Sequence, residues 1–278
     1  MVPRLVHFVF GLRPQTEPFH LVHYLAIESA RRILAPEKIL VHFKWLPYGV
    51  YWDLIRPALT LVDADEAPEV LAASYDDNLV PERYRYAHHA DFVRLAALIE
   101  YGGVYADIDT LFLRPFPDAL FSEPFVIGEE DLVRDQQTGQ LRRSLCNALM
   151  MSEPRSLFAR TWLERMGDAL NGTWSNHSGF LARAVADELP RAVRVEPRTT
   201  FFPAPVAVDG IRGLLEEDRG LDAAGALSVH LWAHLWWEAN RRDFSAVHAG
   251  LLTADYIRSV DTTYNRLARP FLPDIDLW

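Results

Sequence analysis

The chain has 278 residues, of which half are hydrophobic, and a formal net charge of −10. This length and composition predict a folded globular protein and exclude both a small peptide module and an extended disordered chain. The acidic excess disfavours a general nucleic-acid binder, and the single cysteine, Cys146, excludes a disulfide framework and a multi-thiolate zinc site.

The first hundred residues predict alternating strands and helices. β-Favouring runs that predict strands lie at 5–10, 38–43 and 58–62. A segment at 20–34 has the three- or four-residue spacing of a helix. A second helical pattern covers 85–101 and stops at Gly102 and Gly103. This alternation predicts an α/β domain with a mostly parallel sheet.

The segment 104–109 alternates strictly between apolar and polar residues. As a strand it would place Val104, Ala106 and Ile108 on one side, and Tyr105, Asp107 and Asp109 on the other. We therefore expect one face to join the core and the other to present two carboxylates.

The second half predicts a mixture of strands and helices. Strands are expected at 124–128, 145–151, 192–196 and 226–232, and helices at 154–170, 180–189 and 251–267. No repeat or linker divides the chain, so we expect one domain. The mixed charge of 251–267 favours a helix that caps the domain, and pairing with another subunit or contact with a membrane surface stays open.

Asp107 and Asp109, two apart on one predicted strand, are the first candidate site. Like charges so close repel unless a cation lies between them, and Mg²⁺ or Mn²⁺ is the usual solution. The pattern alone is weak, because Asp63 and Asp65 repeat it in what we interpret as a solvated turn.

Asp91 and Arg94 strengthen the signal. They are three residues apart on the preceding predicted helix, so their side chains project together. They could bind sugar hydroxyls and phosphate oxygens, or they could form an ordinary salt bridge on a solvent-facing helix. A simple salt bridge leaves the Gly-Gly turn and the two aspartates unexplained.

Residues 90–94 and 98–109 resemble the Asp-x-x-Arg and Gly-Gly-x-Tyr-x-Asp-x-Asp signature of glycosyltransferases with a DXD sugar-binding region. These include glycosyltransferase family 32, with its yeast mannosyltransferases and bacterial capsule enzymes, and the related large clostridial glucosylating toxins. The resemblance implies a GT-A type, Rossmann-like α/β sandwich. It also implies a nucleotide-sugar-binding half at about 1–110, an acceptor-side half at about 111–240 and a C-terminal helical extension at about 241–278.

Two outlying segments extend the resemblance. Residues 6–11 are similar to the family's opening strand, which implies that Val9 and Phe10 contact the nucleotide base. Residues 229–236 are similar to its closing His-x-Trp-x-x-x-Trp segment, in which the histidine, here His230, completes the metal and diphosphate shell. His230 is otherwise a packed core histidine, and Trp232 and Trp236 are equally compatible with core and site.

Other site residues follow from the same resemblance. It implies that Asn147 faces the donor sugar and that Tyr105 packs near the sugar or nucleotide. The segment 176–180 corresponds to a turn that commonly faces the acceptor, from which it differs at Ser178 and Phe180. The acidic residues 129–131 either face the acceptor or form a solvated loop.

The resulting hypothesis is a metal-dependent glycosyltransferase. A divalent cation, Mn²⁺ or Mg²⁺, would be held by Asp107, Asp109 and His230, and Asp107 would act directly, through water or on the ribose and sugar. Asp91 and Arg94 would hold the sugar ring of a UDP- or GDP-sugar donor, whose sugar goes to a carbohydrate or other hydroxyl acceptor.

Family resemblance further implies transfer with retention of configuration, plausibly in bacterial polysaccharide or glycoconjugate biosynthesis. Two alternatives stay open: a non-catalytic sugar-nucleotide binder or accessory subunit, and a nucleotidyltransferase or phosphodiesterase. No stretch approaches the roughly 18 apolar residues of a membrane span, and the N-terminus has no signal-peptide pattern. We therefore expect a cytoplasmic protein.

Overall fold

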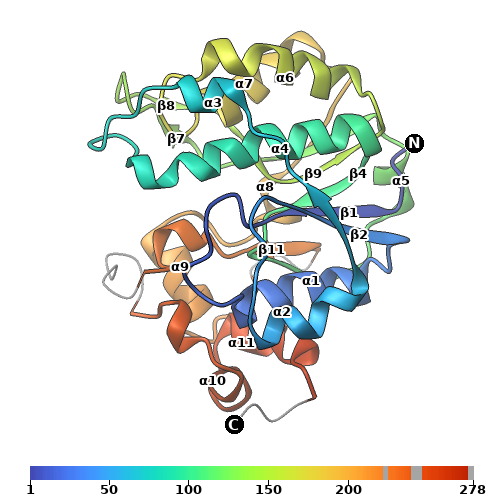
Figure 1. The fold of residues 1–278 in the computed structure, drawn as a ribbon, viewed down its shortest axis with the longest axis vertical. Helices are drawn as coiled ribbons and strands as arrows, with labels where there is room; N and C mark the ends of the chain where they lie inside the picture. Colours follow the sequence, from blue (N-terminus) through green and yellow to red (C-terminus); the bar gives the residue numbers. More distant parts are fainter. Residues whose placement is uncertain (222–224, 239–245, 275–278) are drawn as a thin grey trace.

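The computed structural model describes residues 1–221, 225–238 and 246–274. Its centre is a seven-stranded sheet in the order β10-β6-β9-β4-β1-β2-β3 (Figure 1). Its strands are β1 (Leu5–Val9), β2 (Lys38–Phe43), β3 (Leu59–Asp63), β4 (Gly103–Ala106), β6 (Phe125–Glu129), β9 (Leu145–Ser152) and β10 (Arg194–Glu196). Two-stranded sheets are formed by β5 (Thr110–Phe112) with β11 (Ser228–His230), and by β7 (Val133–Arg134) with β8 (Leu141–Arg142).

Helices cover both faces of the large sheet, which makes the molecule a sandwich (Figure 1). On one face lie α3 (Pro68–Ala72), α4 (Arg85–Tyr101), α6 (Leu157–Ala169) and α7 (Leu181–Glu188). On the other lie α1 (Leu21–Ile33), α2 (Val50–Ile55), α9 (Val208–Leu215), α10 (Ala254–Ser259) and α11 (Thr263–Ala268). Two four-residue helices, α5 (Asp118–Phe121) and α8 (Arg198–Phe201), complete the α-helices of the described residues.

Every pairing in the large sheet is parallel except the two made by β9, which runs antiparallel to β4 and to β6. The predicted α/β fold with a mostly parallel sheet is therefore confirmed. Because β9 is reversed, its first residues lie beside the carboxyl ends of its neighbours, with Ala106 opposite Leu149 and Glu129 opposite Leu145.

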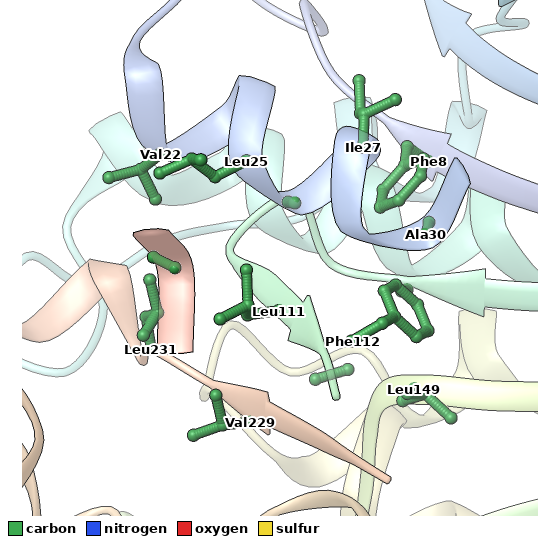
Figure 2. Close-up of a cluster of buried hydrophobic side chains, with 14 of the residues drawn as sticks. Phe8, Val22, Leu25, Ile27, Ala30, Leu111, Phe112, Leu149, Val229 and Leu231 are labelled. Carbon is green, nitrogen blue, oxygen red and sulfur yellow. The ribbon is translucent and has the colours of Figure 1, made fainter. Parts of the chain in front are cut away.

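Strand residues alternate between two hydrophobic cores. Val104 and Ala106 of β4 join the core that includes α1, whereas Tyr105 joins the core that includes α4. Figure 2 shows part of the first core, where Ile27 of α1 lies beside Phe8 of β1. The side chains of β4 thus alternate as predicted, but both faces of the strand are buried.

Gly102 and Gly103 join α4 to β4 at a place where only glycine fits. Their φ angles are +65° and +109°, which side chains disfavour. A Cβ on Gly102 would lie 2.6 Å from Pro154 Cδ, and one on Gly103 would lie 2.8 Å from the Leu5 carbonyl oxygen. This close passage lets the chain leave α4 and enter the sheet directly beside β1.

The structure corrects two predicted elements. The strand expected at 104–109 ends at Ala106, and Asp107 and Asp109 lie in the turn to β5, closed by a 3.0 Å bond from Thr110 N to the Asp107 carbonyl. The helix expected at 251–267 is interrupted between α10 and α11, where the Thr262 hydroxyl caps α11 by accepting from Asn265 N at 3.1 Å.

Nothing in the structure tests the predicted division into halves and an extension, and residues 239–245 and 275–278 of those parts lie outside the described residues. Across the described ranges, no helix is both long and apolar enough to span a membrane.

Candidate active site

A cavity of about 360 Å³ opens at the carboxyl ends of β1, β4 and β6. In open parallel sheets, ligands bind at this edge. Ten of the residues singled out by the sequence line this cavity: Val9, Phe10, Asp91, Arg94, Tyr105, Asp107, Asp109, Asn147, His230 and Trp232. Tertiary structure therefore collects in one place what the chain distributes over more than 200 residues.

Asp107, Asp109 and His230 form a compact cluster in this cavity. One ligand atom from each residue lies within 4.8 Å of the others. His230 Nε2 lies 2.9 Å from Asp109 Oδ1 and 3.6 Å from Asp107 Oδ2. Two carboxylates and an imidazole nitrogen are a donor set that suits a divalent cation such as Mn²⁺, so the residues fit the metal that the motif implies.

The two carboxylates differ electrostatically. Burial opposes ionisation of Asp109, but His230 and a backbone N–H outweigh it and lower the pKa of Asp109 to about 2. At Asp107, burial dominates over the opposing effects of Arg94 and His230, and the pKa is raised. Burial lowers the pKa of His230, but the negative charge of Asp109 more than compensates, so that pKa is raised.

The backbone around Trp232 holds Asp109 in place. Trp232 adopts the left-handed conformation, with φ 52° and ψ 46°, directly before the 3₁₀ turn η4 (Ala233–Leu235). This turn aims the Ala233 N–H at Asp109 Oδ2, at 2.8 Å. Left-handed backbone is uncommon outside glycine, and such strain concentrates at functional sites.

Arg94 links two carboxylates of the site. Its guanidinium lies 3.1 Å from Asp107 Oδ1 and 3.2 Å from Asp91 Oδ1, and it stacks over the Tyr105 ring at 4.6 Å. The Tyr105 hydroxyl in turn donates to Asp107 Oδ1 at 2.6 Å. Asp91 and Arg94 do form the expected i,i+3 ion pair, but it is buried in the cavity wall and not on a solvent-facing surface.

Asp91 is surrounded by donors. Asn147 Nδ2 donates to Oδ1 at 2.8 Å, and His177 Nε2 lies 2.8 Å from Oδ2. Burial alone would raise the pKa of Asp91, but Arg94 and His177 lower it below its usual value. With Arg94 these make three donors for about four acceptor positions on the carboxylate, which leaves one for a ligand.

Sequence reasoning missed the role of His177. It lies in a π-helical turn, η3 (Asn176–Phe180), and is fully buried. Its ring packs edge to face against His88, which bonds the Tyr75 hydroxyl at 2.6 Å. The family resemblance predicts an acceptor-facing turn at 176–180. No local signal in the sequence connects it to Asp91, which lies 86 residues away.

The closing tryptophans have different positions. Trp232 lines the cavity, and its Nε1 donates to the Ala204 carbonyl at 3.2 Å. Trp236 is fully buried outside the cavity lining and donates to the Leu231 carbonyl, so it belongs to the core. Trp237, which the sequence did not single out, lines the cavity and stacks on His23 at 4.9 Å.

The acidic residues 129–131 also divide. Glu129 is paired with Arg143, and Asp131 is paired with Arg198, all at partly solvated positions. Of the three, Glu130 alone lines the cavity, where its Oε2 accepts from the Ser144 hydroxyl at 2.8 Å.

Comparisons with known proteins identify the family. Residues 60–127 match the model of the glycosyltransferase sugar-binding region containing the DXD motif. Glucan organizing enzyme 1 of Cryptococcus neoformans is 32% identical over 280 residues, which cover 98% of this chain and 71% of that protein. The chain belongs to this family of DXD glycosyltransferases.

Solved structures with a similar arrangement include two other glycosyltransferases. The galactosyltransferase LgtC, solved with donor and acceptor sugar analogues, has a TM-score of 0.49 and 14% identity over 97% of this chain and 98% of its own. The PaToxG glycosyltransferase has a TM-score of 0.45 and 15% identity over 68% of this chain and 70% of its own. The assignment of this chain to the DXD glycosyltransferases rests on the sequence matches and not on these two structural similarities.

The region of this chain that matches the family model, residues 60–127, ends within β6. It contains Asp91, Arg94, Asp107 and Asp109, whereas Asn147, His177 and His230 are supplied by segments that follow it. The motif therefore provides only part of the candidate site, and the fold supplies the partners that hold each carboxylate.

Proposed function

We propose that this glycosyltransferase transfers a sugar from a nucleoside-diphosphate sugar, UDP- or GDP-linked, to a hydroxyl acceptor, with help from a divalent cation. The observation that supports this most strongly is the cluster of Asp107, Asp109 and His230 in the same cavity as the Asp91–Arg94–Asn147 network. These three residues would hold Mn²⁺ or Mg²⁺, which neutralises charge on the diphosphate leaving group.

Other residues of the cavity would bind and orient the donor. The spare acceptor position of Asp91 would bind a donor-sugar hydroxyl, while Arg94 fixes the orientation of Asp91 and Asp107. Val9 and Phe10, at the end of β1, would contact the base. Tyr105 would hold Asp107 in place through its hydroxyl hydrogen bond. Since Trp232 borders the same cluster, it would enclose the diphosphate.

We extend the proposal to retention of anomeric configuration, to a role in bacterial polysaccharide or glycoconjugate synthesis and to a cytoplasmic location. All three rest on the resemblance to family members and on the sequence pattern. Retention is checked by determining the configuration of the product by NMR before it equilibrates.

The first test is release of nucleoside diphosphate from a panel of UDP- and GDP-sugars with Mn²⁺, with Mg²⁺ and with chelator. Metal-dependent release from one donor supports the proposal and identifies that donor. Binding of a donor without release, under all acceptors tried, would favour the non-catalytic binder. Pyrophosphate or a nucleoside monophosphate as product would instead favour a nucleotidyltransferase or phosphodiesterase.

A further inference from the structure

The order of the strands determines which residues lie at each end of the cavity. Val9 ends β1 and Phe10 follows it. Asp107 follows β4, Asn147 lies near the start of β9, and Glu130 directly follows β6. Adjacent strands are about 4.8 Å apart. Glu130 therefore lies two strands beyond the DXD turn and three beyond the proposed base contacts, at the end of the cavity away from the nucleotide.

Glu130 is anchored in this position by β9. Its backbone N–H donates to the Ser144 carbonyl at 3.2 Å, and its Oε2 accepts from the Ser144 hydroxyl at 2.8 Å. Within the described residues, Oε1 has no hydrogen-bond partner and no cation pairs with the carboxyl. Glu130 is thus an oriented group with one oxygen free for a ligand.

Gly179 of η3 packs directly against this pair. A Cβ at that position would collide with Ser144 Oγ, lie 2.8 Å from the Leu145 carbonyl oxygen and come within 3.5 Å of Glu130 Oε2. The missing side chain lets η3 close over Ser144 and Glu130. Gly179 and Ser178 line the cavity with Glu130, so η3 and the end of β6 form one wall.

The chemistry of Glu130 suits a hydroxyl ligand. Burial raises the pKa of Glu130 to about 7, against opposing effects of Ser144 and His230. Near neutral pH the carboxyl is therefore present in both protonation states and can either donate or accept a hydrogen bond. A hydroxyl group has the same two capacities, whereas a phosphate oxygen would be repelled by the ionised form.

We propose that Glu130, oriented by Ser144 and enclosed by Gly179, binds a hydroxyl of the acceptor, and that the acceptor is a polyhydroxylated molecule of the carbohydrate class. This inference rests on the proposed function, because it names the acceptor side of the same site. It assigns Asp91 and Asn147 to the donor sugar, and Glu130 to the molecule that receives it.

The experiment separates donor binding from turnover in Glu130→Ala, Glu130→Gln and Ser144→Ala. Donor affinity is measured by calorimetry with the preferred UDP- or GDP-sugar and Mn²⁺. Turnover is measured as nucleoside-diphosphate release, with water as acceptor and with methyl glucosides, galactosides and mannosides and glycerol. Glu129→Gln is the matched control, since Glu129 is the exposed neighbour outside the cavity lining.

Glu130→Ala should lower turnover about 10- to 100-fold, the effect of losing one hydrogen bond to a charged group, and leave the donor Kd unchanged. Glu130→Gln keeps a donor and an acceptor and should recover most of the loss, and Ser144→Ala should fall between them. Because water occupies the place of the acceptor hydroxyl, the test holds even if no sugar in the panel is used.

Two results would overturn the assignment. Unchanged turnover in Glu130→Ala would show that the carboxyl has no part in acceptor binding. A donor Kd that weakens in parallel with turnover, while the Kd for the free nucleoside diphosphate stays constant, would place Glu130 on the donor sugar. Failure of the proposed function is distinct, because wild type would then neither bind nor consume any sugar nucleotide.

Discussion

Two carboxyl groups in the same cavity, Asp91 and Glu130, are held in opposite ways. Asp91 has three donors, of which Arg94 is fixed in charge, and its pKa lies below its usual value. Among the residues that the structure describes, Glu130 has one side-chain partner, the neutral Ser144 hydroxyl, and burial raises the pKa of Glu130 to about 7. Both are in the cavity wall, so location alone does not determine ionisation.

The difference shows how the site divides its work. A carboxylate with several donors is ionised and immobile, which suits a group that must fix one sugar ring. A half-buried carboxyl without a partner cation, such as Glu130, changes protonation near neutral pH, which suits contact with a hydroxyl. Four variants test this difference between the charged network of the site and Glu130.

Arg94→Met should have the largest effect. It leaves the buried Asp91 and the half-buried Asp107 without their shared cation, so we expect the free energy of unfolding to fall by about 3–5 kcal/mol. Urea denaturation monitored by tryptophan fluorescence measures this. Arg165→Met, which breaks an exposed pair with Glu188, should cost less than about 1 kcal/mol. Equal losses in the two variants would contradict the buried-network interpretation.

Asp109→Ala should lower metal-dependent nucleoside-diphosphate release about 100- to 1000-fold, the range for losing a group that stabilises developing charge. Direct metal binding, followed by Mn²⁺ electron paramagnetic resonance, should weaken as well. The Asp-x-Asp pattern at Asp63 and Asp65 supplies the control, since Asp65→Ala alters an exposed carboxylate outside the cavity lining. A variant at Asp109 that retained wild-type release with metal would refute the metal assignment.

His177→Phe keeps a ring but removes the donor to Asp91 Oδ2. We expect the KM for the donor to rise about 10- to 100-fold, because one hydrogen bond to a charged group is lost. His177→Gln can still donate a hydrogen bond and should recover part of the affinity. If His177 only filled space, the glutamine variant would recover none. Similar KM values for the phenylalanine and glutamine variants would assign His177 to packing alone.

Glu130→Gln should have a pH-dependent effect on stability. As pH rises from about 4.5 to 7, Glu130 ionises in the unfolded chain before it ionises in the folded protein, so wild type loses stability relative to the variant. The difference should grow by about 3 kcal/mol over this window and level off above it. Urea midpoints of both proteins in chelator, across this range, measure it. A constant difference would show that the Glu130 pKa is not raised.

Part of this molecule was determined by local sequence. The helix at 85–101 and the strand at 38–43 have their predicted boundaries, because hydrophobic spacing and the glycines at 102–103 fix the backbone locally. The Asp-x-x-Arg and Asp-x-Asp patterns likewise identified four cavity residues, since their spacing is short enough for one helix or turn to determine their direction.

Tertiary structure decided the contacts that hold these residues in place. His230 reaches Asp109 across 121 positions of the chain, and His177 reaches Asp91 across 86. Glu130 lines the cavity because its backbone and its side chain both bond Ser144, which directly precedes the reversed strand β9. Periodicity determines which face of an element is buried, but it does not encode which distant element packs there. Partners, burial and pKa values therefore arose only from the packing.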